Sequence, residues 1–364
     1  MPAANASALA SATDSETAPA LNAENASRSL RRGLVSLAIL VALAGGLILA
    51  VPGLHGVAHT LAHMQLGWIA AAIALEILSC LGYVLAFLQV FETAPLRFGG
   101  RVALTELAFG TAVSLGGAGS VAVGAWLLIE RGAPPARVAE RSVVLFLVTS
   151  AVNVITMTVV GLALFLGILP GPDNPLLSAV PAAVGIAVLA FFFALPRLSE
   201  IAAARRAPGR IQRLLETTAE SVRDTRDLLL KPDWRIVGAF AYLWCDIAVL
   251  AVCFAATGHS PPLAAIVLAY QIGYLSNLIP IPGGIGILDG SMIGMLVLYG
   301  VAATPAAAAT LVYHAIALWI PAMWGTAAFL ILRRTRHQPL TLRPSLAERR
   351  RLRADRRSRP DRDG

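Results

Sequence analysis

The sequence predicts an all-α polytopic membrane protein, with about six full transmembrane helices and two broken helical hairpins. Three observations favour this fold class. Hydrophobic residues make up 57% of the 364 residues and charged residues only 14%, whereas a soluble domain averages about 25% charged residues. The apolar residues fall in long runs separated by short loops. Arginines supply every basic charge except that of Lys231 and concentrate in the loops and tails.

The apolar runs define the expected spans and the domain organisation. A full span needs about 20 apolar residues to cross a ~30 Å hydrocarbon core. The expected full spans are 34–52, 66–90, 142–168, 177–196, 236–257 and 306–332. We expect a disordered tail over 1–30, a transmembrane domain over 31–335 and an Arg-rich tail over 336–364. The basic stretch 198–232 predicts either an amphipathic surface helix or a solvated linker.

The arginines sort the loops into two sets, which predicts a topology. Loops rich in arginine lie at 28–32, 97–101, 131–141, 197–235 and from 333 onward; loops without Lys or Arg lie at 52–65, 169–176, 258–261 and 301–305. Basic loops stay on the cytoplasmic side of a membrane. The sequence therefore predicts a multi-pass protein of a bacterial-type plasma membrane with both termini in the cytoplasm.

Two glycine-rich breaks interrupt apolar stretches and predict hairpins at 102–131 and 262–300. Proline and glycine end a helix, and a break in hydrocarbon persists only where protein or water satisfies its backbone. Arms of ~13–18 residues are short for a full crossing, so we expect re-entrant hairpins, with eight tilted helices as the alternative. The hairpins have opposite orientations, which is typical of an inverted-repeat transporter with a mid-membrane site. Chance similarity of glycine-rich segments is the other reading.

Polar side chains at mid-membrane depth are the candidate site residues. Counting ~1.5 Å per residue from the expected loop ends puts Asp289 about 16 Å deep, His314 about 12 Å deep, and Glu106 only about 6 Å deep. A charge near the bilayer centre costs roughly 2.5–3.5 kcal/mol, so such residues bind a ligand or lock helices together. The residues predicted to bind a headgroup are Pro282, Gly283, Gly284, Gly286, Asp289, His314, Tyr313, Gly116, Gly117 and Gly119; those of a polar pathway are Glu76, Glu106, Asp246, Gln271 and Asn277.

The chemistry of these residues suggests ligands of two kinds. The second arm of each hairpin would begin at mid-membrane, and its free N–H groups suit a phosphate or carboxylate. Asp289 beside such an end suits a proton, a cation or an amine-bearing headgroup as well. No soluble-enzyme motif, metal-ligand spacing or cofactor fingerprint is found, and the three cysteines lie in apolar segments as buried hydrophobes. We therefore expect no cofactor, no metal and no nucleic-acid partner.

The stretch Pro280-Ile281-Pro282-Gly283-Gly284-Ile285-Gly286, with Asp289 beyond it, resembles the lysylphosphatidylglycerol-synthase transmembrane family, also called flippase-like or UPF0104 membrane proteins. That family usually has Glu at the position of Asp289. Tyr313-His314 and Trp319-Ile320-Pro321 resemble its last helix, where Arg commonly stands at the position of His314. The first hairpin keeps Gly116 to Gly119 but lacks the family's Pro and Glu–Arg pair.

The resemblance implies a protein that moves or binds a lipid headgroup, such as an aminoacylated phospholipid or a polyprenyl-linked glycan. Synthase members carry a soluble domain after the membrane part; since only the Arg-rich tail follows here, we expect no synthesis and no enzyme activity. The expected partners are membrane lipids with an anionic or lipid-linked headgroup. The alternatives are a membrane-embedded lipid-modifying enzyme, an accessory subunit of an envelope-biosynthesis partner, and a small-solute secondary transporter.

Overall fold

The computed structural model describes residues 27–36, 38, 55–92, 94–112, 118–172, 174–204, 222–223, 225–226, 234–275 and 287–335. Within these residues every regular element is a helix and there is no strand, which confirms the all-α class. The main helices are α3 (His55–Ala62), α4 (Leu66–Val90), α5 (Leu96–Ala112), α6 (Ala118–Glu130), α7 (Pro135–Phe165), α8 (Leu176–Ala204), α10 (Val237–Ala256), α11 (Leu263–Leu275), α12 (Ile287–Leu298) and α13 (Ala303–Arg334), with a 3₁₀ turn, η2, at Trp234–Ile236.

Five described helices are long and apolar enough to cross a membrane: Leu66–Val90, Pro135–Phe165, Leu176–Leu195, Val237–Ala256 and Ala303–Arg334. Each overlaps a span expected from the sequence. Most of the expected first span, 34–52, lies outside the described residues. A multi-pass membrane protein is therefore confirmed at the level of its apolar helices.

Several helices extend beyond the apolar runs and include residues that were expected in loops. Arg97 and Arg101 belong to the first turns of α5, and Arg137 and Arg141 to those of α7, although both pairs were expected in loops. The physical reason is that arginine can hold its guanidinium in the polar layer while its stem and backbone continue a helix. The expected loop 52–65 likewise contains the short helix α3. Most of 198–232, the expected amphipathic segment, lies outside the described residues.

The antiparallel pair of α4 and α10 forms the centre of the bundle. Their backbones meet at two glycines: a Cβ on Gly82 would lie 2.5 Å from the Tyr242 nitrogen, and one on Gly238 would lie 2.8 Å from the Ala86 nitrogen. Small residues at a crossing let two membrane helices approach this closely. The Ser79 hydroxyl donates a hydrogen bond of 2.8 Å to the Tyr242 carbonyl and fixes the same crossing.

Helix α13 packs along α5, again with a glycine at the contact. A Cβ on Gly325 would lie 2.0 Å from the Leu104 carbonyl oxygen, so only glycine fits there. At one end of this contact the Arg131 guanidinium donates a 2.8 Å hydrogen bond to the Thr335 carbonyl and lies over the Phe98 ring. The beginning of α5, the end of α6 and the end of α13 therefore share one end of the molecule.

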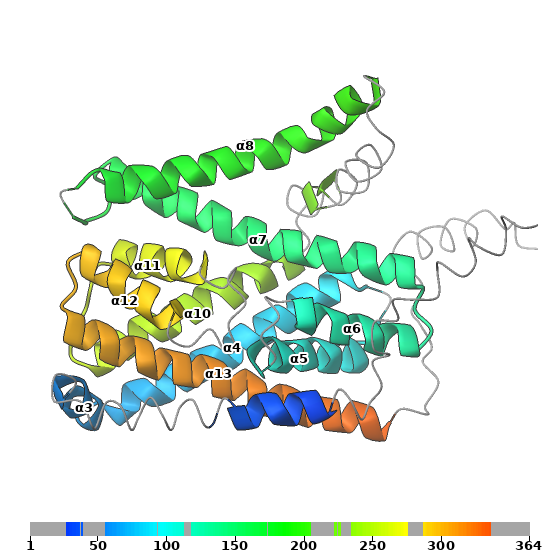
Figure 1. Cartoon of the computed structure of the whole chain (residues 1–364), viewed down its shortest axis with the longest axis horizontal. Helices are drawn as coiled ribbons and strands as arrows, with labels where there is room; N and C mark the ends of the chain where they lie inside the picture. The colour runs from blue at the N-terminus through cyan, green and yellow to red at the C-terminus, as the bar shows by residue number, and fades with distance from the viewer. Residues whose placement is uncertain are drawn as a thin grey trace, which may run out of the picture.

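The short helices form two pairs, α5 with α6 and α11 with α12, which lie in opposite halves of the molecule along its longest axis (Figure 1). The end of α12 is fixed by the Tyr299 hydroxyl, which donates a 2.7 Å hydrogen bond to the Leu177 carbonyl at the beginning of α8. Within its pair, α11 presents Gly273 to α12, where a Cβ on this glycine would lie only 3.1 Å from the Met292 Cβ. The second pair thus packs closely.

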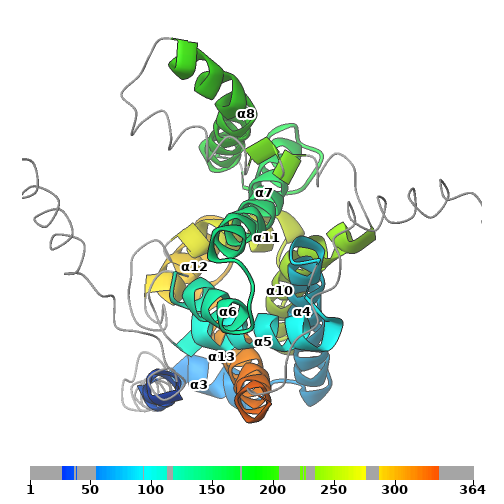
Figure 2. The ribbon, with the colours of Figure 1, turned by 90° about the vertical axis from the view of Figure 1, so that its right-hand side faces the viewer.

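Helices α7 and α8 lie at the edge of the bundle, with α8 outermost (Figure 2). Their contact also uses a glycine, because Gly161 meets the Ala182 backbone. The outward faces are strongly apolar, with Phe146, Val159 and Phe191 all at least 59% exposed. Such a surface suits a lipid environment and would be a liability in water. The inner helices α4, α10, α11, α12 and α13 therefore define the interior where a site can form.

Candidate functional site: a buried polar cluster among five helices

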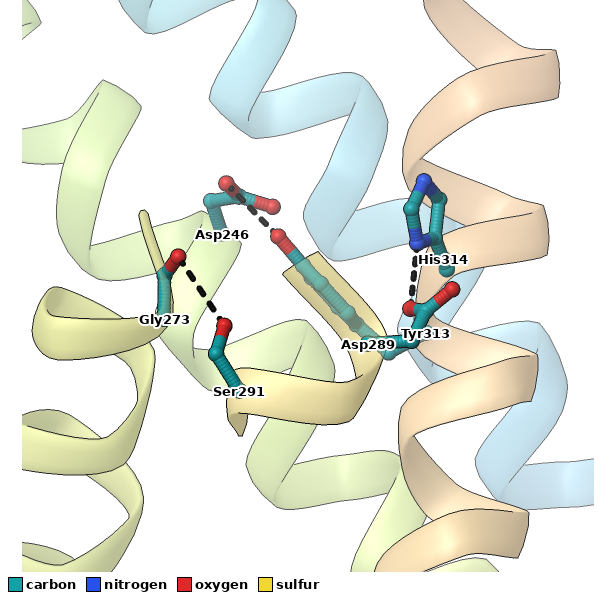
Figure 3. Close-up of polar contacts among 6 residues, drawn as sticks. All are labelled: Asp246, Gly273, Asp289, Ser291, Tyr313 and His314. Carbon is teal, nitrogen blue, oxygen red and sulfur yellow. Dashed lines mark hydrogen bonds and ion pairs between the residues drawn. The ribbon is translucent and has the colours of Figure 1, made fainter. Parts of the chain in front are cut away.

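Asp289 and His314 form a buried pair between α12 and α13. Asp289 lies in the first turn of α12, and the His314 Nδ1 atom is 2.5 Å from its Oδ1. The two residues are 7% and 6% exposed. Figure 3 shows the imidazole directed at the carboxyl group from α13. Two of the residues that the sequence predicted to bind a headgroup are therefore in direct contact.

Asp246 of α10 is held by two tyrosine hydroxyls from other helices. Tyr270 of α11 donates a hydrogen bond of 2.5 Å to Oδ2, and Tyr313 of α13 donates one of 3.2 Å to the same oxygen. All three side chains are buried. Tyr313 and His314 are neighbours in the chain, yet Figure 3 shows one directed at Asp246 and the other at Asp289. One turn of α13 therefore contacts both acids.

Glu76 of α4 brings a second carboxyl group to Asp246. The two groups lie close enough to interact electrostatically across the α4–α10 contact. Glu76 Oε1 also accepts a weak 3.8 Å hydrogen bond from the Cys80 thiol, one turn further along α4. Glu76 is only 4% exposed. Two buried acids on adjacent helices therefore face each other.

Several buried polar atoms of this region make no hydrogen bond within the described part of the chain. They are Glu76 Oε2, Asp246 Oδ1, Gln271 Nε2 and Thr310 Oγ1. Proteins rarely leave buried polar atoms unpaired, because desolvation of each costs about 1–3 kcal/mol. Among these residues, Glu76 and Asp246 interact directly, and buried polar atoms without a partner are typical of a place that a ligand, a proton or water occupies.

Glu106 of α5 forms a contact that is separate from this cluster and involves the α5–α6 pair. Its Oε2 accepts a 2.8 Å hydrogen bond from the Tyr83 hydroxyl of α4, and its side chain lies against Gly124 of α6. Glu106 lies about 15 Å along α5, counted from Leu96. Glu106 is 3% exposed and so belongs to the interior.

The position of α12 beside Asp246 is set by its packing on α11. The Ser291 hydroxyl donates a 3.4 Å hydrogen bond to the Gly273 carbonyl (Figure 3). Met292 is fully buried against Gly273 at the same level. This contact fixes the first turns of α12, and with them Asp289, relative to Tyr270 on α11.

The structure brings together some of the predicted site residues. Glu76, Asp246, Asp289, Tyr313 and His314 meet in one region, Gln271 lies on α11 next to Tyr270, and Gly119 lies in the first turn of α6. The remaining predicted residues lie outside the described residues: Gly116, Gly117, Asn277, Pro282, Gly283, Gly284 and Gly286. Their predicted role in headgroup binding stays a prediction.

Sequence reasoning did not connect three tyrosines with the buried acids. Tyr83, Tyr242 and Tyr270 are not among the site residues that the sequence predicts. The rings of Tyr83 and Tyr242 lie against each other at a tilt, with centroids 5.1 Å apart. A helical-spacing signal existed for Tyr242, because it lies one turn before Asp246 on α10. No local pattern links Tyr83 to Glu106, since the contact joins two helices.

A separate groove lies between the N-terminal helical segment and α13. Its volume is about 380 Å³, and Leu30, Leu34, Trp319 and Thr326 are among its lining residues. The lining is almost wholly apolar, with Arg31 at its edge. Among the described residues, none of those predicted to bind a headgroup lines it. The groove and the buried cluster are therefore distinct features of the same bundle.

Comparison with known proteins identifies the family of this fold. The family described as "Lysylphosphatidylglycerol synthase TM region" matches residues 33–325. Two relatives from Methanothermobacter thermautotrophicus, each named a UPF0104 membrane protein, are 34% identical over 97 residues and 28% identical over 192 residues. These matches cover 26% and 47% of this chain, and 28% and 56% of the relatives. Because the family pattern spans more than half of the chain, the protein belongs to the family of the lysylphosphatidylglycerol synthase TM region.

Proposed function

We propose that the protein is a lipid flippase, which moves a phosphate-bearing lipid headgroup through a mid-membrane site between its two pairs of short helices. The observation that carries the proposal is the buried polar cluster around Asp246 and Asp289. Ionisable groups inside a membrane bundle are costly, and they characteristically line substrate or ion pathways. Exposed apolar side chains on the outer helices suit contact with a lipid's acyl chains.

The short helix pairs support a site at mid-membrane. Helices α6, α11 and α12 have 13, 13 and 12 residues, or about 18–20 Å each, short of a ~30 Å core. We propose that both pairs are re-entrant hairpins of an inverted repeat, entering from opposite sides. In such transporters the broken helices meet at the substrate site. The arginine-rich end would be cytoplasmic, with both termini on that side.

The chemistry of the cluster supports a headgroup that carries a phosphate, either alone or together with a positively charged group. Asp289, in the first turn of α12, is buried inside the protein. Free N–H groups at a helix N-terminus bind phosphate oxygens. Asp289 and His314 next to this turn would bind an amine or hydroxyl of the same headgroup. An anionic or zwitterionic lipid, including a lipid-linked precursor, fits this combination.

A flipping assay tests the proposal. Purified full-length protein is reconstituted in vesicles that contain a fluorescent phospholipid, and a membrane-impermeant quencher reports the exposure of its headgroup. We expect the protein to accelerate exposure, and Asp289→Asn to slow it by about tenfold or more, the loss caused by ~1.4 kcal/mol of lost transition-state stabilisation. Glu140→Gln is the matched control, because it makes the same carboxyl-to-amide change on an exposed face of α7.

The outcomes separate flipping from the alternatives. No acceleration with any labelled phospholipid or lipid-linked precursor would contradict the flippase. Acceleration that Asp289→Asn and Glu140→Gln both leave unchanged would remove Asp289 from the pathway. Uptake of a small solute driven by an ion gradient, without lipid movement, would favour a secondary transporter. Co-purification of a stoichiometric envelope-biosynthesis enzyme, without activity of the protein alone, would favour an accessory role.

A further inference from the structure

The Glu76–Asp246 pair is a buried acidic pair that headgroup binding by Asp289 and His314 does not use. Glu76 and Asp246 come from the two most closely packed helices, α4 and α10, and both are more than nine-tenths buried. Each carboxyl group has one oxygen that makes no hydrogen bond in the described part of the chain. Their other oxygens are engaged by Cys80, Tyr270 and Tyr313. The unpaired atoms are therefore the ones left for the two acids to share.

Two carboxylates in contact inside a low-dielectric interior cannot both stay ionised, because their repulsion adds to the cost of burying each charge. The two tyrosine hydroxyls donate to Asp246 and so favour its ionised form. Glu76 receives only a weak thiol hydrogen bond. One proton shared between the two interacting carboxyl groups supplies a donor for oxygens that otherwise have none.

The described surroundings of the pair contain other titratable groups but no fixed cation that would replace the proton. The groups facing it are Cys80 on α4, Tyr242 and Cys245 on α10, Tyr270 and Tyr274 on α11, and Tyr313 and His314 on α13. Tyr83 on α4, Glu106 on α5 and Asp289 on α12 lie beyond these groups. Helix α7, which packs against α10 and α11, has no titratable residue after Arg141. Among these groups only His314 can add a positive charge, and it already binds Asp289.

Side chains that carry protons connect the pair with both pairs of short helices. Toward α5 and α6, the Tyr242 ring contacts Tyr83, whose hydroxyl donates to Glu106. Toward α12, His314 interacts electrostatically with Asp246 and contacts Asp289. The acidic pair therefore lies between Glu106, on α5, and Asp289, on α12. A proton bound at this point is within a few side chains of either half of the molecule.

We propose that Glu76 and Asp246 together bind one exchangeable proton, and that its uptake and release couple headgroup movement to a proton gradient. The coupling rests on the proposed flippase function, whereas the proton site does not. The proton enters as H⁺ from one aqueous side and sits between the two carboxyl groups. It leaves on the other side, so the pair cycles between one and two negative charges. The doubly charged state is the costly one, which links proton release to a conformation that admits water.

Infrared difference spectroscopy tests the proton site without any transport assay. Spectra of the purified full-length protein at two pH values are subtracted, and the C=O stretch of a protonated carboxyl group is followed. We expect a band that titrates with pH and shifts in D₂O, that is lost in Glu76→Gln and in Asp246→Asn, and that persists in Glu140→Gln. If no titrating carboxyl band is lost in either variant, the site is overturned. The wild-type titration needs no variant, so absence of any titrating carboxyl band in the wild-type protein overturns the site even where a variant misfolds.

A gradient experiment on the wild-type protein tests the coupling. Vesicles with a fluorescent phospholipid receive an imposed pH gradient, a matched Na⁺ gradient, or neither. With one proton per headgroup, a gradient of about one pH unit shifts the final distribution of the lipid up to about tenfold, and Glu76→Gln removes the shift. A response to Na⁺ alone, or flipping that ignores the pH gradient, overturns the coupling. A titrating band without any flipping would leave the proton site standing and would contradict the flippase instead.

Discussion

Two tyrosine hydroxyls hold Asp246 from different helices, and each can be removed without changing the shape of its ring. Tyr270 donates the shorter hydrogen bond, 2.5 Å against 3.2 Å for Tyr313. We expect Tyr270→Phe to lower the free energy of unfolding by about 1.5–3 kcal/mol, the range for a hydrogen bond to a charged group, and Tyr313→Phe by about 0.5–1.5 kcal/mol. Denaturant titration of the purified protein in detergent measures both.

Tyr299→Phe is the matched control for these variants. Its hydroxyl donates to the Leu177 carbonyl, away from the acids. It should lower the free energy of unfolding by about 0.5–1.5 kcal/mol and leave flipping unchanged, whereas Tyr270→Phe should also slow flipping. Equal stability losses for Tyr270→Phe and Tyr313→Phe, with flipping intact in both, would show that the two hydroxyls stabilise the fold equally and take no part in flipping.

Depth counted along the sequence located the acids but not their partners. Asp246, Asp289 and His314 were expected near mid-membrane from the lengths of apolar runs, and all three are buried in the structure. Their pairing depends on which faces of α10, α12 and α13 turn toward one another, and no sequence spacing encodes this. Tyr270 shows the limit of prediction from the sequence, because an aromatic residue on an apolar helix is far more often a packing residue than a hydrogen-bond donor to an acid.

At the scale of helices, the glycine crossing of α4 and α10 sets the distance between Glu76 and Asp246. A Cβ on Gly82 would lie 2.5 Å from the Tyr242 nitrogen and 2.9 Å from the Gly238 oxygen. Since both neighbours are backbone atoms, Gly82→Ala must push the helices apart, at a cost of about 1–3 kcal/mol in the free energy of unfolding. We expect a lower thermal unfolding midpoint in detergent and a weaker titrating carboxyl band.

Gly294→Ala in α12 is the control for this substitution. Nothing lies within 4 Å of a Cβ at that position, so the change should raise stability by about 0.4–1 kcal/mol through the unfolded chain. If Gly82→Ala is as stable as Gly294→Ala, the α4–α10 crossing does not depend on close backbone contact, and the position of Glu76 needs another explanation.

Helix boundaries were predictable where apolar residues alone decide them. The expected 66–90 coincides with α4, and the expected 236–257 differs from α10 by one residue at each end. Boundaries placed at arginines were less accurate, as α5 and α7 show, because a helix continues through the interface while arginine side chains reach the polar layer. The glycine-rich breaks lie largely outside the described residues, and the described helices that follow them begin at Ala118 and Ile287.

At the scale of the whole molecule, the arginines of the described helices gather at one end of the bundle. Phe98, Glu130, Arg131 and Arg333 line one small cavity there, while the opposite end joins Gln65 to Ala256 through a 3.2 Å backbone hydrogen bond. The two pairs of short helices point in opposite directions, because α5 and α6 have their outer ends at the first end and α11 and α12 at the second (Figure 1). The positions of arginines in the loops therefore predicted which segments lie at the same end of the bundle.

This division predicts the sidedness of the protein in a membrane. Ala136, in the first turn of α7 at the arginine-rich end, and Ala302, just before α13 at the other, are both exposed. With Cys80, Cys245 and Cys253 replaced by alanine, we expect a membrane-impermeant maleimide to label Ala302→Cys in intact cells. Ala136→Cys should react only after the cells are opened, because basic ends remain in the cytoplasm. The reverse pattern would invert the topology and exchange the sides from which the two hairpins enter, whereas labelling of both positions from outside would contradict a bundle whose ends lie on opposite sides of the membrane.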